Sequence, residues 1–251
     1  MTKSELSVAI IAKNAASSIG RCLESCSAVS EDIVVIIDSS TTDTTASVCR
    51  KYKARLYTRK FDNFANQKNY ALTHTRNHWV LSLDADEWID SGLQSELSAL
   101  VPQHNITAYR LPRKNIIFGK VINHTNWDPH GLVRLFDRRK SDWQGDVHEQ
   151  IRTKGEISEL FAPIYHENYQ TVEEFLTRQD KYSTLEADEK LRLGVRFNLL
   201  SALFQPVFEF LRRYLWHAGF LDGWHGFYLS YLMAVYHFSV WVKLWQKSRA
   251  V

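Results

Sequence analysis

The first hundred residues alternate strand-length runs with segments whose apolar residues keep a helical spacing. The predicted strands are residues 6–12, 32–38, 55–58 and 79–83. The run at 32–38 (DIVVIID) is rich in β-branched residues, which is typical of a strand buried on both faces. Because helix-length segments separate the strands, we expect βαβ units, in which consecutive strands are parallel and joined by right-handed crossovers. This pattern predicts an α/β fold with a Rossmann-like, mostly parallel central sheet.

The pattern changes after Leu100. The predicted elements there are short antiparallel strands at residues 106–111, 115–121 and 133–137. From Thr171 onward the apolar residues fall on one face of a helix. We therefore expect three parts, which are an α/β half at 1–100, a mixed β half at 101–170 and a helical C-terminal appendage at 171–251.

The composition indicates a folded globular chain whose charge is unevenly distributed. With 251 residues, 45% of them hydrophobic and 24% charged, the chain is neither disordered nor collagen-like. Its net charge of +3 is too small to indicate binding to nucleic acid. The surplus lies in residues 198–251, which hold five Lys and Arg against two Asp and Glu, and four of the eight Trp. A basic, Trp-rich end predicts contact with a membrane surface.

Residues 223–242 form a charge-free stretch of 20 residues, about the length that spans a bilayer. The stretch contains Gly, His, Ser and Tyr residues, in which a spanning helix would be poorer. Three interpretations stay open: a helix in the membrane interface, a spanning helix, or an ordinary buried helical pair. We favour the interface, because Arg212, Arg213, Lys243 and Lys247 flank the stretch.

Two of the predicted parallel strands end in carboxylates, at Asp38 and at Asp84 followed by Asp86. In an open parallel sheet, ligands bind beyond these strand ends. Residues i and i+2 of an extended segment point the same way, so Asp84 and Asp86 are expected to converge. Two such carboxylates repel one another unless a divalent cation joins them, and Mg²⁺ completes its shell with phosphates and water. The pattern therefore favours a metal–diphosphate site, the alternative being acidic residues that merely cap helices.

Several segments in order resemble the family 2 glycosyltransferases, inverting enzymes of the GT-A fold that use nucleotide sugars. The matching segments are VAIIAKN (8–14), IVVIIDSSTTDTT (33–45), FANQKNYAL (64–72), WVLSLDADE (79–87), GLVRLFDRR (131–139), DVHEQI (146–151) and GFLDGWHGFYLSYLMA (219–234). The last three are similar to the bacterial subgroup that adds sugars to the lipopolysaccharide core, including β-glucosyltransferases. One departure is Ser40, where the family usually has a Gly that permits an unusual backbone conformation.

The resemblance implies a nucleotide-sugar site in the first half. Asp38 would accept a hydrogen bond from the base, and Asn14 would lie beside the same base. Asp84 would hold the ribose or the metal shell, and Asp86 would bind Mg²⁺ or Mn²⁺ directly. Lys68 would lie near the diphosphate as a point charge.

The resemblance also implies that the second half binds and activates the acceptor. Inversion needs a general base opposite the leaving diphosphate, and a carboxylate is the usual choice. Glu149 is the candidate base, with Asp146 as the alternative. His148 would ligate the metal or form a structural pair with the neighbouring Glu. Arg134 is either a phosphate or acceptor contact or a salt-bridged strand residue.

The remaining conspicuous side chains have a structural interpretation beside a functional one. Trp127 and Trp143 could stack on sugar faces, although a buried Trp in a core is commoner. The three cysteines, Cys22, Cys26 and Cys49, are an odd count without a disulfide framework, and free cysteines are usually small buried residues.

The resemblance predicts an inverting, metal-dependent transferase that moves glucose from UDP-glucose to a lipopolysaccharide core sugar by single displacement. Its partners would be the nucleotide-sugar donor, a lipid-linked saccharide acceptor and a membrane surface. The apolar run before Lys13 is too short for a secretory signal, so we expect the cytosolic face of the inner membrane. Alternatives are a family 2 enzyme with another glycan or lipid-linked acceptor, a nucleotidyltransferase, or an inactive membrane scaffold. The oligomeric state is left open.

Overall fold

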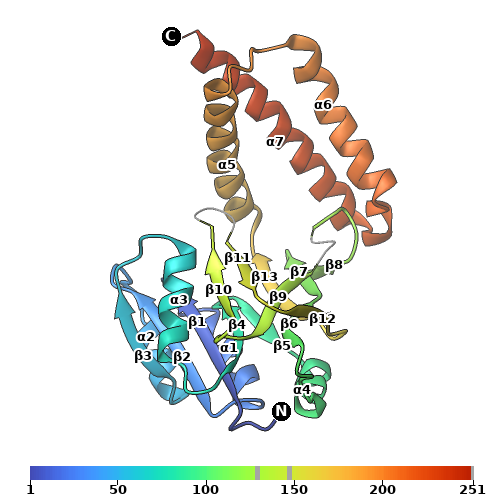
Figure 1. Cartoon of the computed structure of the whole chain (residues 1–251). Coiled ribbons are helices and arrows are strands. Elements are labelled where there is room, and N and C mark those ends of the chain that lie inside the picture. The colour runs from blue at the N-terminus through green and yellow to red at the C-terminus, as the bar shows by residue number, and fades with distance from the viewer. Residues whose placement is uncertain (128–130, 146–148, 250–251) are drawn as a thin grey trace. The chain divides into compact units, whose positions relative to one another are not determined.

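The computed structural model describes residues 1–127, 131–145 and 149–249, and the chain divides into two compact units (Figure 1). Unit 1 comprises residues 1–114 and 130–166, and unit 2 comprises residues 115–129 and 167–251. Two strands, β7 (Arg113–Ile117) and β13 (Ile164–Tyr169), run from one unit into the other.

Unit 1 is built on a seven-stranded sheet with the order β12-β6-β9-β4-β1-β2-β3. Its strands are β1 (Leu6–Ala12), β2 (Asp32–Asp38), β3 (Arg55–Arg59), β4 (Trp79–Asp84), β6 (Ile106–Leu111), β9 (Leu132–Asp137) and β12 (Glu156–Glu159). The pairs β4–β1, β1–β2 and β2–β3 are parallel, whereas β9 runs antiparallel to both β4 and β6. The mostly parallel α/β sheet expected from the sequence is confirmed.

Helices cover both faces of this sheet. They are α1 (Ile19–Ser27), α2 (Thr45–Lys51), α3 (Phe64–His74) and α4 (Ser91–Ala99). Along β2 the side chains alternate: Val35 packs in the cluster that holds α1, α2 and α4 residues, and Val34 and Ile36 pack in the cluster that holds α3 residues. Burial on both faces explains why β2 is apolar without a polar alternation.

The smaller strands form antiparallel pairs. In unit 1, β5 (Glu87–Ile89) pairs with the first part of β13, and β10 (Ser141–Gln144) pairs with β11 (Gln150–Thr153). In unit 2, β7 pairs with β8 (Lys120–Ile122). The single strand predicted at 115–121 is therefore wrong, because Phe118 and Gly119 both take positive φ and form a two-residue hairpin turn.

Unit 2 is mainly helical, with α5 (Val172–Arg192), α6 (Leu199–Leu211), η1 (Arg212–Trp216), η2 (Gly219–Asp222) and α7 (Trp224–Ser248). Side-chain caps begin the first two helices: the Thr171 hydroxyl accepts from Glu174 N, and the Asn198 amide oxygen accepts from Ser201 N. Helix α7 packs against both α5 and α6 (Figure 1). The charge-free stretch 223–242 thus lies almost wholly in α7, and within the described residues no helix is long and apolar enough to cross a membrane.

Gly226 is required where α7 begins. A Cβ atom on Gly226 would lie 1.8 Å from the Gly219 carbonyl oxygen, far inside van der Waals contact. We predict that Gly226→Ala lowers the free energy of unfolding of unit 2 by about 3 kcal/mol, because η2 and α7 must separate. Urea unfolding monitored by Trp fluorescence measures the loss.

The matched control is Gly20→Ala in α1, where the nearest atoms to an added Cβ lie 3.7 Å away. Alanine is the better helix former, so this variant should keep or raise stability by up to about 1 kcal/mol. Equal stability of the Gly226→Ala and Gly20→Ala variants would contradict the prediction.

Candidate active site

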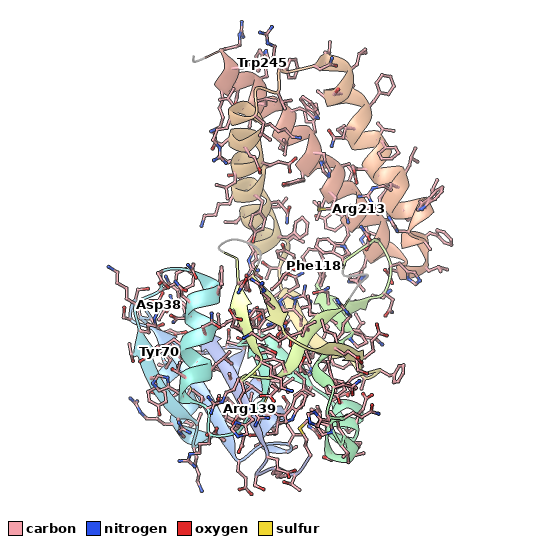
Figure 2. All side chains as sticks on the ribbon, viewed as in Figure 1. Asp38, Tyr70, Phe118, Arg139, Arg213 and Trp245 are labelled. Carbon is pink, nitrogen blue, oxygen red and sulfur yellow. The ribbon has the colours of Figure 1, made fainter. Side chains whose placement is uncertain are left out.

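The carboxylates predicted at strand ends lie at one edge of the unit 1 sheet. Asp38, labelled in Figure 2, ends β2, and Asp84 ends β4. Both strands are parallel neighbours of β1. Asp86 lies in the turn between β4 and β5, so it does not continue an extended segment with Asp84. The expected convergence of Asp84 and Asp86 on one target is therefore replaced by two separate sets of partners.

Asp38 is buried among donors from three loops, one of which is the Phe61 backbone N–H, 3.4 Å from its carboxylate. Its carboxylate accepts from the Ser40 backbone N–H at 3.1 Å and hydroxyl at 2.9 Å, and the Lys13 ammonium lies 3.1 Å away. The Ser40 N–H lowers the pKa of Asp38 most, burial raises it, and the Ser40 hydroxyl and Lys13 lower it further, to about 2. Ser40 is not among the described residues with positive φ, so the loop accommodates Ser at this position.

Asn14 joins the loop after β1 to the loop after β2. Its amide oxygen accepts from the Thr42 backbone N–H at 2.9 Å, and its own backbone is left-handed, with φ of 46°. Asn is one of the few residues with a side chain that adopts this conformation readily. The two loops that carry Asn14 and Asp38 are thereby fixed to one another.

Lys68 connects the end of β4 to the candidate base. Helix α3 carries its side chain, which is 3% exposed, to a point where Nζ lies 3.0 Å from Asp84 Oδ1 and 2.9 Å from Glu149 Oε1. The ammonium also lies 4.5 Å from the centre of the Trp143 ring. The structure thus brings Glu149 together with Lys68 and Asp84, which lie 65 or more positions before it in the sequence.

Arg134 holds the other oxygen of Asp84. Its Nη2 donates to Asp84 Oδ2 at 2.8 Å and to Glu87 Oε1 at 3.1 Å, and Arg113 Nη1 lies 3.5 Å from the same Glu87 oxygen. Glu87, which is fully buried, also accepts from the Asp84 backbone N–H at 3.0 Å. Of the two interpretations of Arg134, the structure therefore shows the salt-bridged strand residue.

These contacts form one chain of alternating charges. Its members in order are Glu149, Lys68, Asp84, Arg134, Glu87 and Arg113. Burial raises the pKa of Asp84, but the Arg134 guanidinium and the Lys68 ammonium outweigh burial and hold that pKa well below its usual range. Burial lowers the pKa of Arg134, and Asp84 and Glu87 more than offset it, so Arg134 stays charged.

Asp86 faces a histidine that the sequence analysis did not identify. Strand β13 pairs His166 with Glu87, and His166 Nε2 lies 3.6 Å from Asp86 Oδ2. His148 and Asp146 lie outside the described residues. Among the residues that are described, no three His, Cys, Asp or Glu side chains converge on one point. An oxygen and a nitrogen donor fit a divalent cation that takes its remaining ligands from diphosphate and water.

Trp143 is fixed by a pair of backbone contacts. Asn69 on α3 donates to the Trp143 carbonyl at 2.8 Å and accepts from the Trp143 N–H at 2.9 Å. The indole ring is buried under Lys68 and Arg134, so it forms the apolar floor of the charge chain and does not offer a free face. In unit 2, Trp127 packs edge-on against Tyr169 and Phe175, which supports the core interpretation of that residue.

The cysteines are structural. All three are buried, Cys22 and Cys26 on the inner face of α1. The hydrogen bond with Cys26 and burial raise the pKa of the Cys22 thiol, and burial raises the pKa of Cys49 to about 11. Thiols with raised pKa are poor nucleophiles and poor metal ligands.

The fold and site lead to a defined enzyme family. The family model "Glycosyl transferase family 2" matches residues 7–153, which include β1, the carboxylate-ending strands and the charge chain. The chain is a family 2 glycosyltransferase. Its sheet, parallel from β3 to β4 with antiparallel β9 beside it, is the GT-A arrangement expected from the resemblance.

Relatives extend this similarity over almost the whole transferase. The chain is 30% identical to "Lipopolysaccharide core biosynthesis glycosyltransferase LpsC" of Rhizobium meliloti, over 98% of this chain and 93% of that protein. It is 22% identical to "Uncharacterized glycosyltransferase RC0292" of Rickettsia conorii, over 97% and 91% of the two chains. The transferase is thus related along its length to a lipopolysaccharide core glycosyltransferase.

Two solved structures have a distant overall similarity to this chain. The crystal structure of S. aureus TarS 1–349 is 13% identical with a TM-score of 0.49, covering 98% of this chain and 92% of that one. Glucosyl-3-phosphoglycerate synthase from Mycobacterium tuberculosis, in complex with Mn²⁺, UDP and phosphoglyceric acid, is 14% identical with a TM-score of 0.47, covering 76% and 78%.

The depressed pKa of Asp38 makes the stability of the transferase depend on pH. The folded pKa of about 2 lies below the ordinary value of 3.8, so the ionised carboxylate stabilises the fold above about pH 4. This contribution is lost as pH falls through the folded pKa. We predict that the difference in unfolding free energy between the wild type and Asp38→Asn is constant above about pH 5 and shrinks as pH falls from about 4 to 2.

Urea unfolding across this pH range measures the difference. Ser40→Ala is the companion variant, since it removes one donor to the carboxylate and should shift the loss toward higher pH. A difference that stays the same at every pH would show that Asp38 is not held ionised by these donors.

Proposed function

We propose that this transferase moves a hexose, namely glucose from UDP-glucose, onto a sugar of the lipopolysaccharide core with inversion. The observation that carries the proposal is Lys68, whose ammonium binds the candidate base Glu149 at 2.9 Å and Asp84 of the strand end at 3.0 Å. One ammonium therefore holds the candidate base beside a carboxylate of the donor side. The relationship to LpsC supports a lipopolysaccharide core acceptor.

The donor would bind across the strand ends of the 1–100 half. Asp38, ionised at neutral pH, would accept the N3–H of a uracil, and Asn14 would lie beside that base. Asp84 would contact the ribose or the water shell of the metal. Lys68 would turn from its carboxylates toward the diphosphate, whose higher charge density attracts the ammonium more strongly.

The residues present would hold Mg²⁺ or Mn²⁺ through Asp86, with His148 or His166 as a second donor. When bound, the cation stabilises charge that develops on the leaving diphosphate. The half-exposed Asp86 carboxylate, free of the charge chain, is the donor that reaches a substrate without breaking that chain.

Transfer of the sugar would follow from the pairing of Lys68 with Glu149. As Lys68 moves onto the diphosphate, Glu149 becomes free to accept a proton. The acceptor hydroxyl attacks the anomeric carbon, a new C–O bond forms, and the bond to the diphosphate oxygen breaks on the opposite face. The hydroxyl proton passes to Glu149, and the electron pair of the broken bond leaves with the diphosphate.

The acceptor would be a lipid-linked saccharide bound by the 101–170 half at the cytosolic face of the inner membrane. A family 2 enzyme with another glycan or lipid-linked acceptor would use the same charge chain, so the acceptor is the open part of the proposal. Membership of the family sets aside the nucleotidyltransferase alternative. The completeness of the charge chain argues against an inactive scaffold.

Glu149→Gln should abolish transfer while leaving the donor site intact. Glutamine keeps the shape of the side chain but cannot take the acceptor proton, so we expect the transfer rate to fall about 10²–10⁴-fold. Calorimetry should show that UDP still binds. The matched control is Glu159→Gln, an exposed carboxylate on β12 of the same unit, which should keep the wild-type rate. Wild-type transfer by the Glu149→Gln enzyme would place the base elsewhere.

Asp86→Ala should remove metal-dependent chemistry. We expect the wild type to hydrolyse UDP-glucose slowly in the presence of Mn²⁺, and we expect Asp86→Ala to lower that rate at least about 100-fold, because charge stabilisation by a metal is worth several kcal/mol. The thermal shift produced by UDP-glucose should no longer depend on Mn²⁺. Asp142→Ala, an exposed carboxylate on β10, is the control that should retain both. Full hydrolysis by the Asp86→Ala enzyme would overturn the metal role.

A further inference from the structure

Unit 2 has a large exposed apolar surface on α6 and the turns that follow it. Twelve large apolar side chains between Leu199 and Trp224 are 46% to 85% exposed, and we call them the α6 face. Figure 2 shows side chains projecting from α6 on the side away from α7. Exposed apolar patches of this kind mark sites of interaction in folded proteins.

The polarity of α6 is opposite to that of an ordinary surface helix. Its polar residues face α7: Gln205 accepts from the Trp241 indole at 2.6 Å, and Glu209 lies 3.9 Å from His237. Its apolar residues, among them Phe204 and Phe208, point outward. A helix beside water normally buries its apolar stripe and exposes its polar one. The inverted arrangement indicates that the outer side of α6 contacts an apolar environment and not water.

The exposed charged residues between Lys190 and Arg249, the segment that contains the α6 face, are all positive. Between Lys190 and Arg249, every residue of which is described, the only acidic residues are Glu209 and Asp222. Their side chains are 12% and 3% exposed, and each is bound internally, Glu209 by Arg212 and Asp222 by the backbone N–H of His124. The exposed charges nearest the start of α6 are Arg192 and Arg196.

The end of the α6 face carries two tryptophans. Trp216, at the end of η1, is 85% exposed, and Trp224, at the start of α7, is 72% exposed. Indole rings concentrate where a bilayer meets water, because they are apolar with one polar N–H. The 13 residues of α6 extend about 20 Å, a length that suits a helix lying in the plane of the interface.

We propose that the α6 face lies in the surface of a bilayer rich in anionic lipids. Positive charge without exposed carboxylates matches phosphate headgroups, and the apolar side chains match the boundary of the acyl chains. A second copy fits less well, since a two-fold interface pairs the same face of both copies, and this face offers no exposed carboxylate to pair with Arg192 and Arg196. The contact thus falls mainly on α6, and of the 223–242 stretch only Trp224 belongs to the α6 face.

The proposed function includes contact with a membrane, and the α6 face is the surface that would make it. The inference rests on the proposed function for its biological role, but its test does not. Vesicle binding requires neither donor nor acceptor. A wild-type chain that binds vesicles but does not transfer sugar would refute the proposed function alone, and a wild-type chain that transfers sugar but does not bind vesicles would refute the inference alone.

The experiment measures sedimentation of the full chain with vesicles of phosphatidylcholine, alone or with about a third phosphatidylglycerol. The wild type should bind the anionic vesicles, and binding should weaken as salt increases. The double variant F204Q/F208Q should bind about 100-fold more weakly, since two large apolar side chains leave the lipid. R192Q and R196Q should each weaken binding about fivefold.

The matched control is Phe161→Gln, which removes a phenylalanine of 84% exposure from unit 1 and should leave vesicle binding unchanged. Circular dichroism and the unfolding transition verify that F204Q/F208Q remains folded. Absence of wild-type binding to anionic vesicles at low salt, or equal binding by F204Q/F208Q, would overturn the proposal. So would a wild-type dimer in light scattering that F204Q/F208Q converts to a monomer, since the α6 face would then belong to a second copy.

Discussion

The buried ammonium of Lys68 is the interaction on which the active-site half depends. Its carboxylate partners come from the end of β4 and from the segment before β11, so one side chain on α3 ties together three elements. An ion buried to this degree is stable only with its partners, and removing one partner of such a pair costs about 3–5 kcal/mol. The same constraint keeps Asp84 ionised, and through Arg134 it extends to Glu87 and Arg113. The carboxylates of the strand ends are therefore already paired within the protein, and a charged substrate must exchange partners with them.

Parts of this site follow from the sequence because they are local. A run of β-branched residues that ends in Asp predicts both the strand and the edge at which its carboxylate lies, as β2 and Asp38 show. The same holds for Asp84 and for the parallel order of β1, β2 and β4. Lys68 was assigned through the resemblance, since nothing in a helix of mixed composition marks one lysine as buried.

Other parts depend on contacts that no local pattern contains. Glu87 and Arg113 belong to strands that are ordinary in sequence, and His166 reaches Asp86 only because β13 pairs with β5. A signal for Glu87 did exist: it follows Asp84 and Asp86 directly, and a third carboxylate in a buried strand requires a cation nearby. The turn at Ala85 and Asp86 likewise separates two aspartates that the i, i+2 rule for extended chains would place together.

The helical unit shows why counting charges along a chain differs from knowing which of them face outward. In a count of charges from Lys190 to Arg249, two carboxylates offset part of the positive charge. Both are buried against internal partners, so the exposed surface is more cationic than the count indicates. Hydrophobicity likewise does not reveal which residues face outward. The charge-free stretch 223–242 lies in α7, which packs against helices on two sides, whereas the shorter α6 exposes its apolar residues. Periodicity identifies an apolar stripe, but only the neighbouring helices decide whether that stripe is covered. In α6 the polar residues occupy the covered side, and the cost of leaving Phe and Leu in water is removed only where water is absent.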